Sequence, residues 1–262
     1  MMTTLQAFLL GIVQGLTEFL PVSSSAHLVV VQHLFGFKEP LVAFDVALHF
    51  GTLAALFVYF RRDLVQLVKN IFVPGPATRL AFGIVIASIP TAFIGFTFKD
   101  WFETLFGSLQ AVGFALLGTS ALLWMTRKRE AGRREIGHGK VLDFLLIGSM
   151  QGFAIIPGIS RSGATLVTGL LRGFKREDAF RFSFLLSIPA VLGAGILELR
   201  DGPLVNEMSR ATLAAGFLAA AITGFLALGF LERIVKKGKL HRFAGYTLTL
   251  GLLVLAVSRR LE

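Results

Sequence analysis

The chain has 262 residues, of which 54% are hydrophobic and only 16% are charged, and its mean hydropathy is +0.72. This composition excludes an ordinary soluble domain, in which about a quarter of the residues carry charge, and predicts an all-α polytopic membrane protein. The sequence has no cysteine, which excludes disulfides and thiolate chemistry. The formal charge of +10 does not indicate a nucleic-acid partner, because basic loops of membrane proteins gather on the cytoplasmic side.

Six stretches free of ionisable side chains predict transmembrane helices, since a charge near the bilayer centre costs about 2.5–3.5 kcal/mol. A spanning helix needs about 20 residues, and the boundaries are predicted only to within a few residues. In chain order the predicted spans contain residues 50–60, within an apolar run from Leu41, then 80–98, 104–126, 182–197, 211–231 and 243–258.

The basic residues of the connecting segments are distributed unequally between the two sides that these spans define. One side carries 19 Lys and Arg residues and the other carries six. Because Lys and Arg are enriched in cytoplasmic loops, the richer side is predicted to be cytoplasmic and both termini are predicted to lie outside.

Two further apolar regions, 5–35 and 143–171, are each broken midway by proline and polar residues. Pro21 precedes three serines in the first region, and Pro157 precedes a Ser-Arg-Ser run in the second. Each half is too short to span a bilayer. We therefore predict two re-entrant helix hairpins, whose irregular tips must be buried in protein or line a cavity.

The two hairpins resemble one another in sequence. A shift of 137 residues superposes 9–38 on 146–175 without a gap, with 11 identities in 30 positions. Three predicted spans follow each hairpin, so the second copy should be inverted relative to the first. The prediction is one integral membrane domain, 1–262, with repeat one at about 1–126 and repeat two at about 141–258.

The two copies differ at their ionisable groups, which suggests a composite site at the bilayer midplane where the hairpin tips meet. One hairpin supplies an acid, hydroxyls and an imidazole, and the other supplies a guanidinium. The differing pairs are Glu18 and Ile155, Ser24 and Arg161, and His27 and Ala164.

Gln14 and Glu18 are four residues apart, so on a helix they share one face and can offer oxygens to a single hard cation. A carboxylate, an amide oxygen and substrate phosphate oxygens suit Mg²⁺ or Ca²⁺ better than zinc. A Glu at a helix end near water is the alternative, but an ionised carboxylate in an apolar hairpin requires a partner or a metal.

Ser160-Arg161-Ser162 follows Pro157-Gly158 and precedes an apolar helical run. The pattern predicts a helix N-terminus capped by Ser160 or Ser162, whose free N–H groups and dipole favour an anion. A neighbouring arginine adds a fork that matches phosphate. The alternative is a structural ion pair between Arg161 and Glu18, which could open when substrate arrives.

Ser24 and His27 are three residues apart, close enough on one helical turn for the imidazole to approach the hydroxyl. This spacing allows a nucleophile with its general base, or an imidazole that activates water. Asp45 and His49 form another pair, four residues apart, that we interpret as interfacial or as supporting the site from behind.

Two motifs taken together resemble the undecaprenyl-diphosphate phosphatase family, also called bacitracin resistance proteins. The first runs from Gln14 to His27 and the second from Pro157 to Thr165. The resemblance covers essentially the whole chain. It implies a multi-pass enzyme of the bacterial cytoplasmic (inner) membrane that hydrolyses undecaprenyl diphosphate with a divalent cation, recycles the lipid carrier of cell-wall synthesis and confers bacitracin resistance.

The resemblance also implies roles for individual residues. It assigns the metal to Gln14 and Glu18, although this chain has Gln where the family motif commonly begins with Glu, which lowers the negative charge available. The catalytic residues implied are Glu18, Ser24, His27 and Arg161. The substrate-binding residues implied are Ser23, Ser160, Ser162 and Thr165.

These residues fit a metal-assisted phosphoryl transfer on a polyprenyl diphosphate whose tail lies among the membrane lipids. The alternative is a lipid flippase or secondary transporter, because inverted repeats and midplane charges suit transport equally well. The sequence leaves the nucleophile, the oligomeric state and the leaflet to which the site opens undetermined.

Overall fold

The computed structural model describes residues 2–37, 41–130, 132–201 and 209–261. The regular secondary structure of these ranges is helical, and an isolated bridge between Arg134 and Phe174 is their one β-type pairing. The helices are α1 Thr4–Phe19, α2 Ser24–Leu34, α3 Val42–Tyr59, α4 Arg61–Asn70, α5 Pro76–Thr97, α6 Lys99–Phe106, α7 Leu109–Trp124, α8 Val141–Phe153, α9 Arg161–Leu171, α10 Arg176–Asp201, α11 Arg210–Lys236 and α12 Arg242–Leu261, with a short 3-10 helix at Ile136–His138.

The predicted class, an all-α polytopic membrane protein, is confirmed. Within the described ranges three helices, α5, α10 and α11, are individually long and apolar enough to cross a bilayer. The number rises to five if the bent pairs α3–α4, with an angle of 71°, and α6–α7, with an angle of 102°, each form one span. The finer count of six spans plus two re-entrant hairpins stays a prediction.

The predicted span 104–126 differs from the structure at its start. The helix breaks at Gly107, and α7 begins at Leu109. Ser108 causes the new start, because its hydroxyl accepts a hydrogen bond from the backbone N–H of Ala111 and caps the helix. The residues before the break form α6, a separate short helix.

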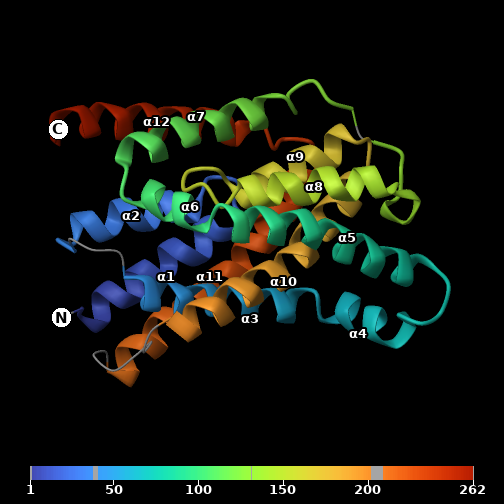
Figure 1. The fold of residues 1–262 in the computed structure, drawn as a ribbon, viewed down its shortest axis with the longest axis horizontal. Helices are drawn as coiled ribbons and strands as arrows, with labels where there is room; N and C mark the ends of the chain where they lie inside the picture. Colours follow the sequence, from blue (N-terminus) through green and yellow to red (C-terminus); the bar gives the residue numbers. More distant parts are fainter. Residues whose placement is uncertain (1, 38–40, 131, 202–208, 262) are drawn as a thin grey trace.

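Each of the two predicted hairpin regions forms two helices with a break between them that contains its proline, α1 and α2 in the first region and α8 and α9 in the second; their re-entrant placement in a bilayer stays a prediction. Helix α1 ends at Phe19, and Leu20, which precedes Pro21, is extended, as a residue before proline prefers. Helices α1 and α2 open toward the end of the molecule that holds both termini, whereas α8 and α9 open toward the opposite end (Figure 1). The two tips therefore meet in the middle of the protein.

The 137-residue shift also relates the local structures of the two hairpins. It maps the bounds of α2, 24–34, onto those of α9, 161–171. It likewise maps Gly36 onto Gly173, and both glycines have a φ of 82°. This left-handed conformation ends each second helix in the same way and favours glycine. The inverted arrangement of the larger repeats stays a prediction.

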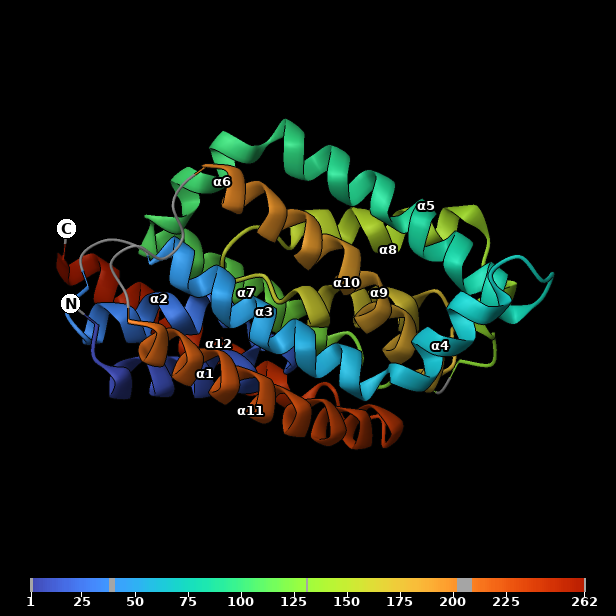
Figure 2. The same cartoon turned by 90° about the horizontal axis from the view of Figure 1, so that it is seen from below.

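Glycine allows the first helix of each hairpin to pack closely on a helix from the other half of the chain. A Cβ at Gly15 of α1 would lie 2.6 Å from the carbonyl oxygen of Ala220 in α11. A Cβ at Gly148 of α8 would lie 1.9 Å from the carbonyl oxygen of Ala87 in α5. Such contacts require small residues. In the view of Figure 2, α1 follows α11 and α8 lies beside α5.

Aromatic residues fill the core next to the hairpin tips. Phe19, the last residue of α1, is fully buried and contacts Phe184 of α10 edge to face, with ring centroids 5.6 Å apart. Phe184 in turn packs against Phe180 and Phe60. These contacts fix the end of α1, and with it the position of the neighbouring Glu18.

Candidate active site

The two hairpin tips are joined directly by hydrogen bonds. The backbone N–H of Gly158 donates to the hydroxyl of Ser23 over 3.2 Å, and the hydroxyl of Ser162 donates to the carbonyl oxygen of Leu20 over 3.3 Å. Ser23 has a φ of 67°, the one positive φ among the described residues other than glycine. This strained conformation places the Ser23 hydroxyl toward the second hairpin instead of capping its own helix.

Glu18 is the centre of this junction. Its carboxylate is buried, with a side-chain exposure of 7%, and Oε1 accepts a hydrogen bond from Nη2 of Arg161 in the second hairpin. Its Oε2 accepts from the hydroxyl of Ser24 over 2.6 Å and from the amide nitrogen of Gln14 over 3.1 Å. The structure thus brings together the acid, the hydroxyl and the guanidinium that the sequence predicted at one composite site.

Two buried polar atoms at this junction have no hydrogen-bond partner within the described part of the chain. Among the described residues, the amide oxygen of Gln14 and Nη1 of Arg161 are buried without a hydrogen-bond partner. A buried polar atom without a partner carries a cost of about 1–3 kcal/mol. One acceptor and one donor therefore stand beside the Glu18–Arg161 pair, able to receive a cation and an anion respectively.

The start of α9 is built as the sequence predicted. Ser160 is the N-cap residue, and its hydroxyl accepts from the backbone N–H of Gly163 over 3.1 Å. The hydroxyl of Ser162 lies 3.2 Å from that of Ser160. Thr165 is almost fully buried and its hydroxyl lies 2.5 Å from that of Ser183, so in this structure it supports α9 from behind.

His27 and Ser24 do not form the pair that their spacing suggested. Nδ1 of His27 lies 2.7 Å from the carbonyl oxygen of Ser23, and Nε2 lies 2.6 Å from the hydroxyl of Tyr246. Ser24 instead donates to Glu18. Both imidazole nitrogens therefore have other partners.

Three residues near the site were missed or undervalued by the sequence analysis. His49 was interpreted as interfacial or supporting, but its Nε2 lies 3.6 Å from Oε2 of Glu18. Tyr246 contacts His27 although the two residues are 219 positions apart in the sequence, and no local pattern indicates this contact. Thr119 joins the second tip to α7, because its hydroxyl donates to the carbonyl oxygen of Gly158 and accepts from the N–H of Ser160.

Asp45 takes part in a network behind His49. The carbonyl oxygen of Asp45 lies 2.7 Å from Nδ1 of His49, and its carboxylate accepts from the amide nitrogen of Gln32 over 2.7 Å. These contacts tie the first turn of α3 to α2 and orient Nε2 of His49 toward Glu18.

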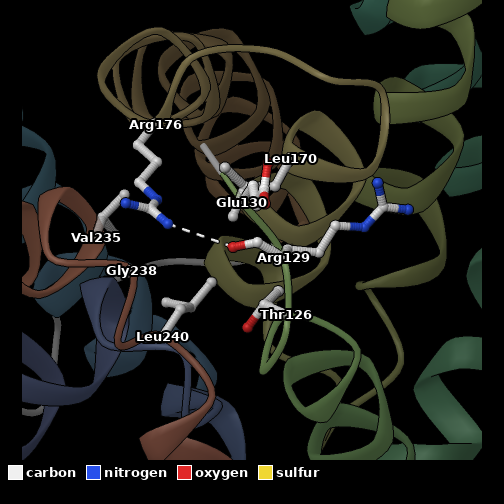
Figure 3. Close-up of a pocket in the computed structure, with 8 residues that line it drawn as sticks. All are labelled: Thr126, Arg129, Glu130, Leu170, Arg176, Val235, Gly238 and Leu240. Atoms are coloured by element: carbon white, nitrogen blue, oxygen red, sulfur yellow. Dashed lines mark hydrogen bonds between the residues drawn. The ribbon is translucent and has the colours of Figure 1, made fainter. Parts of the chain in front are cut away.

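A small cavity of about 10 Å³ lies outside this site, between the connection that follows α7 and the end of α11 (Figure 3). The guanidinium of Arg176 donates there to the carbonyl oxygens of Arg129 and Lys236. The volume is about that of one water molecule. This region joins connecting segments and contains none of the predicted site residues.

The fold and the site define a class of protein: a polytopic helical membrane protein with a buried acid, arginine and hydroxyl cluster where two hairpin tips meet. The family described as bacitracin resistance protein BacA matches residues 7–253 of the chain. The chain belongs to this family.

Three relatives, each named undecaprenyl-diphosphatase, are similar to the chain over nearly its whole length. The protein of Carboxydothermus hydrogenoformans is 42% identical, with 98% of each chain covered. That of Moorella thermoacetica is 43% identical, with 98% of each chain covered. That of Desulfosudis oleivorans is 46% identical, with 99% of this chain and 100% of the relative covered.

Proposed function

We propose that the protein hydrolyses undecaprenyl diphosphate to undecaprenyl phosphate and inorganic phosphate. One observation carries this proposal: the buried guanidinium of Arg161, at the N-terminus of α9, has one nitrogen on Glu18 and a second nitrogen without a partner. A buried arginine beside a helix N-terminus suits a phosphate group. The names of the relatives add the substrate.

In this proposal the terminal phosphate displaces Glu18 from Arg161. The guanidinium then matches the charge that spreads over the phosphoryl oxygens in the transition state. The hydroxyls of Ser23, Ser160 and Ser162 surround the same tip and orient the group. Because Arg161 already has a free buried donor, binding can begin before the ion pair opens.

The residues present fit a divalent cation, Mg²⁺ or Ca²⁺. The buried amide oxygen of Gln14 has no hydrogen-bond partner, and Glu18 provides a carboxylate beside it. Oxygen ligands of this kind suit hard cations that complete their coordination with phosphate oxygens and water. When bound, the cation would neutralise charge on the diphosphate. Gln14 and Glu18 would hold it, and the Glu18–Arg161 contact would loosen.

The attack forms a bond between an oxygen and the terminal phosphorus and breaks the bond from that phosphorus to the bridging oxygen. The proton of the attacking hydroxyl must pass to a base, and undecaprenyl phosphate leaves. Two routes stay open: water activated by His27 attacks the phosphorus directly, or Ser24 attacks it to form a phosphoserine, which a water molecule then hydrolyses to inorganic phosphate and free serine. The hydrogen bond from Ser24 to Glu18 favours a second role for this serine, which is to hold the carboxylate in place.

The proposal includes a setting for the reaction. The protein resides in the bacterial cytoplasmic (inner) membrane, with both termini outside, and the polyprenyl tail lies among membrane lipids next to the helices. Its product is the monophosphate carrier that cell-wall synthesis reuses, and recycling this carrier confers bacitracin resistance. The distribution of basic residues and the family support these statements.

The test uses purified protein in detergent with undecaprenyl diphosphate as substrate. We expect phosphate release that a chelator abolishes and Mg²⁺ or Ca²⁺ restores. Arg161→Ala should release no phosphate above background, and the active wild-type preparation is its control. A protein that releases no phosphate under any of these conditions, but moves the lipid between leaflets of a liposome, would instead be a flippase.

A further inference from the structure

His27 is held at both ring nitrogens, and the chemistry of its partners assigns the proton. A carbonyl oxygen can only accept a hydrogen bond, so Nδ1, which lies 2.7 Å from the carbonyl oxygen of Ser23, carries a proton. In the neutral imidazole Nε2 then holds the lone pair. The hydroxyl of Tyr246, 2.6 Å away, therefore donates to Nε2. The two rings are nearly parallel, with planes 8° apart.

Beside this pair, α2 and α12 contribute residues to one apolar cluster together with α7. Ala26, next to His27, is fully buried in a cluster that includes Leu250 and Val254 of α12. Tyr246, Leu250 and Val254 are spaced four residues apart, so they follow one face of α12. The phenol therefore lies on the face of α12 that joins the apolar cluster around Ala26.

Helix α12 is in turn held against α7 by glycines. A Cβ at Gly113 of α7 would lie 2.6 Å from Cγ of Leu255, and one at Gly251 would lie 3.1 Å from the carbonyl oxygen of Gly113. Helix α7 also contacts the second hairpin tip through Thr119. The position of Tyr246 is therefore fixed relative to both hairpins, although half of its surface is exposed.

We propose that Tyr246 is a positioning residue for His27. The carbonyl oxygen of Ser23 sets the tautomer, and the hydroxyl of Tyr246 orients the ring by donating to the Nε2 lone pair until the attacking hydroxyl takes its place. The proton of the attacking hydroxyl then passes to Nε2, because Nδ1 already carries one. This inference rests on the proposed function for its catalytic consequence, whereas the tautomer and the contact do not depend on activity.

The geometry also explains why Ser24 and His27 are not paired. Both imidazole nitrogens are engaged, and the hydroxyl of Ser24 donates to Glu18. The attacking hydroxyl must therefore reach Nε2 at the place that the Tyr246 hydroxyl fills, at the edge of the site between α2 and α12.

The chain offers a matched control, because it has only two tyrosines. The hydroxyl of Tyr59 donates to Glu232 over 2.5 Å, in a different part of the fold. Tyr246→Phe and Tyr59→Phe each remove one phenolic hydroxyl that donates to an acceptor and keep the packed ring. Thermal unfolding of both variants checks that each remains folded.

The first measurement is ¹⁵N NMR of the histidine-labelled protein in detergent, with the His27 signals assigned from a His27→Gln sample. We expect Nδ1 to be protonated, and Nε2 to be unprotonated with the shift of a hydrogen-bonded acceptor. In Tyr246→Phe the Nε2 signal should move to the position of a free acceptor while Nδ1 stays. Tyr59→Phe should match the wild type. An unmoved Nε2 signal in Tyr246→Phe, or a proton on Nε2 of the neutral ring, overturns the proposal.

The second measurement separates positioning from binding. In Tyr246→Phe we expect kcat to fall about three- to tenfold, the size of one lost hydrogen bond, with KM nearly unchanged. A raised KM with normal kcat would mean that Tyr246 contacts the lipid and would overturn the positioning role. If the wild type itself releases no phosphate, the proposed function fails, and the NMR result still decides the contact with His27.

Discussion

Two buried carboxylates, Glu18 and Asp143, are each paired with arginine, but their surroundings differ. Asp143, in the first turn of α8, accepts from Arg134 and from Arg172, each over 2.6 Å, and from the backbone N–H of Lys140 over 2.9 Å. Two guanidinium groups and a capping N–H therefore satisfy both of its oxygens. Arg172 ends α9, so the cluster closes the open end of the second hairpin.

Glu18 differs from Asp143 in two ways: it lies at the closed tip of a hairpin, the first one, and its described surroundings contain polar atoms without partners. Its partners leave a buried donor on Arg161 and a buried acceptor on Gln14 unused, whereas neither arginine of the Asp143 cluster has such an atom among the described residues. Buried polar atoms without partners are rare and call for an explanation. The comparison indicates that the Asp143 cluster stabilises the fold and that the Glu18 cluster is prepared to bind a ligand.

Replacement of Arg161 should have the largest effect among the tests of this difference between the Glu18 and Asp143 clusters. Arg161→Ala should lower kcat/KM by at least about 100-fold, because phosphoryl charge then lacks its buried donor. Replacing Ser23, Ser160 or Ser162 singly should cost less. Arg172→Ala is the matched control: it should reduce thermal stability and leave turnover at low temperature nearly intact. Near-normal turnover in Arg161→Ala would contradict the composite site.

Glu18→Gln should abolish most activity and weaken the dependence on the divalent cation, because the variant loses the carboxylate beside Gln14. Loss of a group that only supports a metal ligand typically costs about 10- to 100-fold in affinity or activity, so loss of a ligand itself should cost at least as much. The measurement is phosphate release titrated with Mg²⁺. Asp143→Asn provides the control and should leave the titration unchanged. An unchanged titration in Glu18→Gln would remove this residue from the metal role.

Asp143→Asn should act on stability instead of turnover. Burial alone would raise the pKa of this carboxyl, but hydrogen bonds from Arg134, Lys140 and Arg172 hold the pKa at about 2. The loss of charged hydrogen bonds should lower the free energy of unfolding by about 1–3 kcal/mol. The thermal midpoint in detergent measures this loss. Glu135→Gln, at an exposed pair with Lys175, should change the midpoint little.

The same shift predicts a dependence on pH. Because the pKa of Asp143 is lower in the folded protein than in the unfolded chain, its stabilisation is fully present above about pH 4. It is lost as the pH falls toward 2. The difference in thermal midpoint between wild type and Asp143→Asn should therefore shrink from pH 6 to pH 3. A constant difference would show that the aspartate acts through shape alone.

The parts of the fold that were predictable carry local chemical signals. Proline at 21 and 157 breaks the hairpins wherever they pack, and the repeat relates their helices residue by residue. The Glu18–Arg161 contact could be anticipated because the two copies share a scaffold and differ at their ionisable groups. Membership of the family followed from the two motifs that contain these residues and is confirmed.

The parts that were missed depend on how distant helices pack. Tyr246 reaches His27 because α12 packs against α7, and the chain between these segments gives no sign of that arrangement. The four-residue spacing of Asp45 and His49 was visible, but spacing shows only that two residues share a face. It does not show that Gln32 holds Asp45, or that the shared face turns toward Glu18.

The smallest effect is expected from replacing His49. This replacement tests whether the imidazole only supports Glu18 or takes part in the reaction. Its Nε2 lies 3.6 Å from Oε2 of Glu18 and its side chain is 35% exposed, so the contact should contribute at most about 1 kcal/mol. His49→Gln should then lower kcat/KM by no more than about fivefold. His33→Gln, at an exposed position of α2, should have no effect. A loss above tenfold in His49→Gln would place this imidazole among the reacting groups. The site would then contain two catalytic histidines, His27 and His49, instead of one.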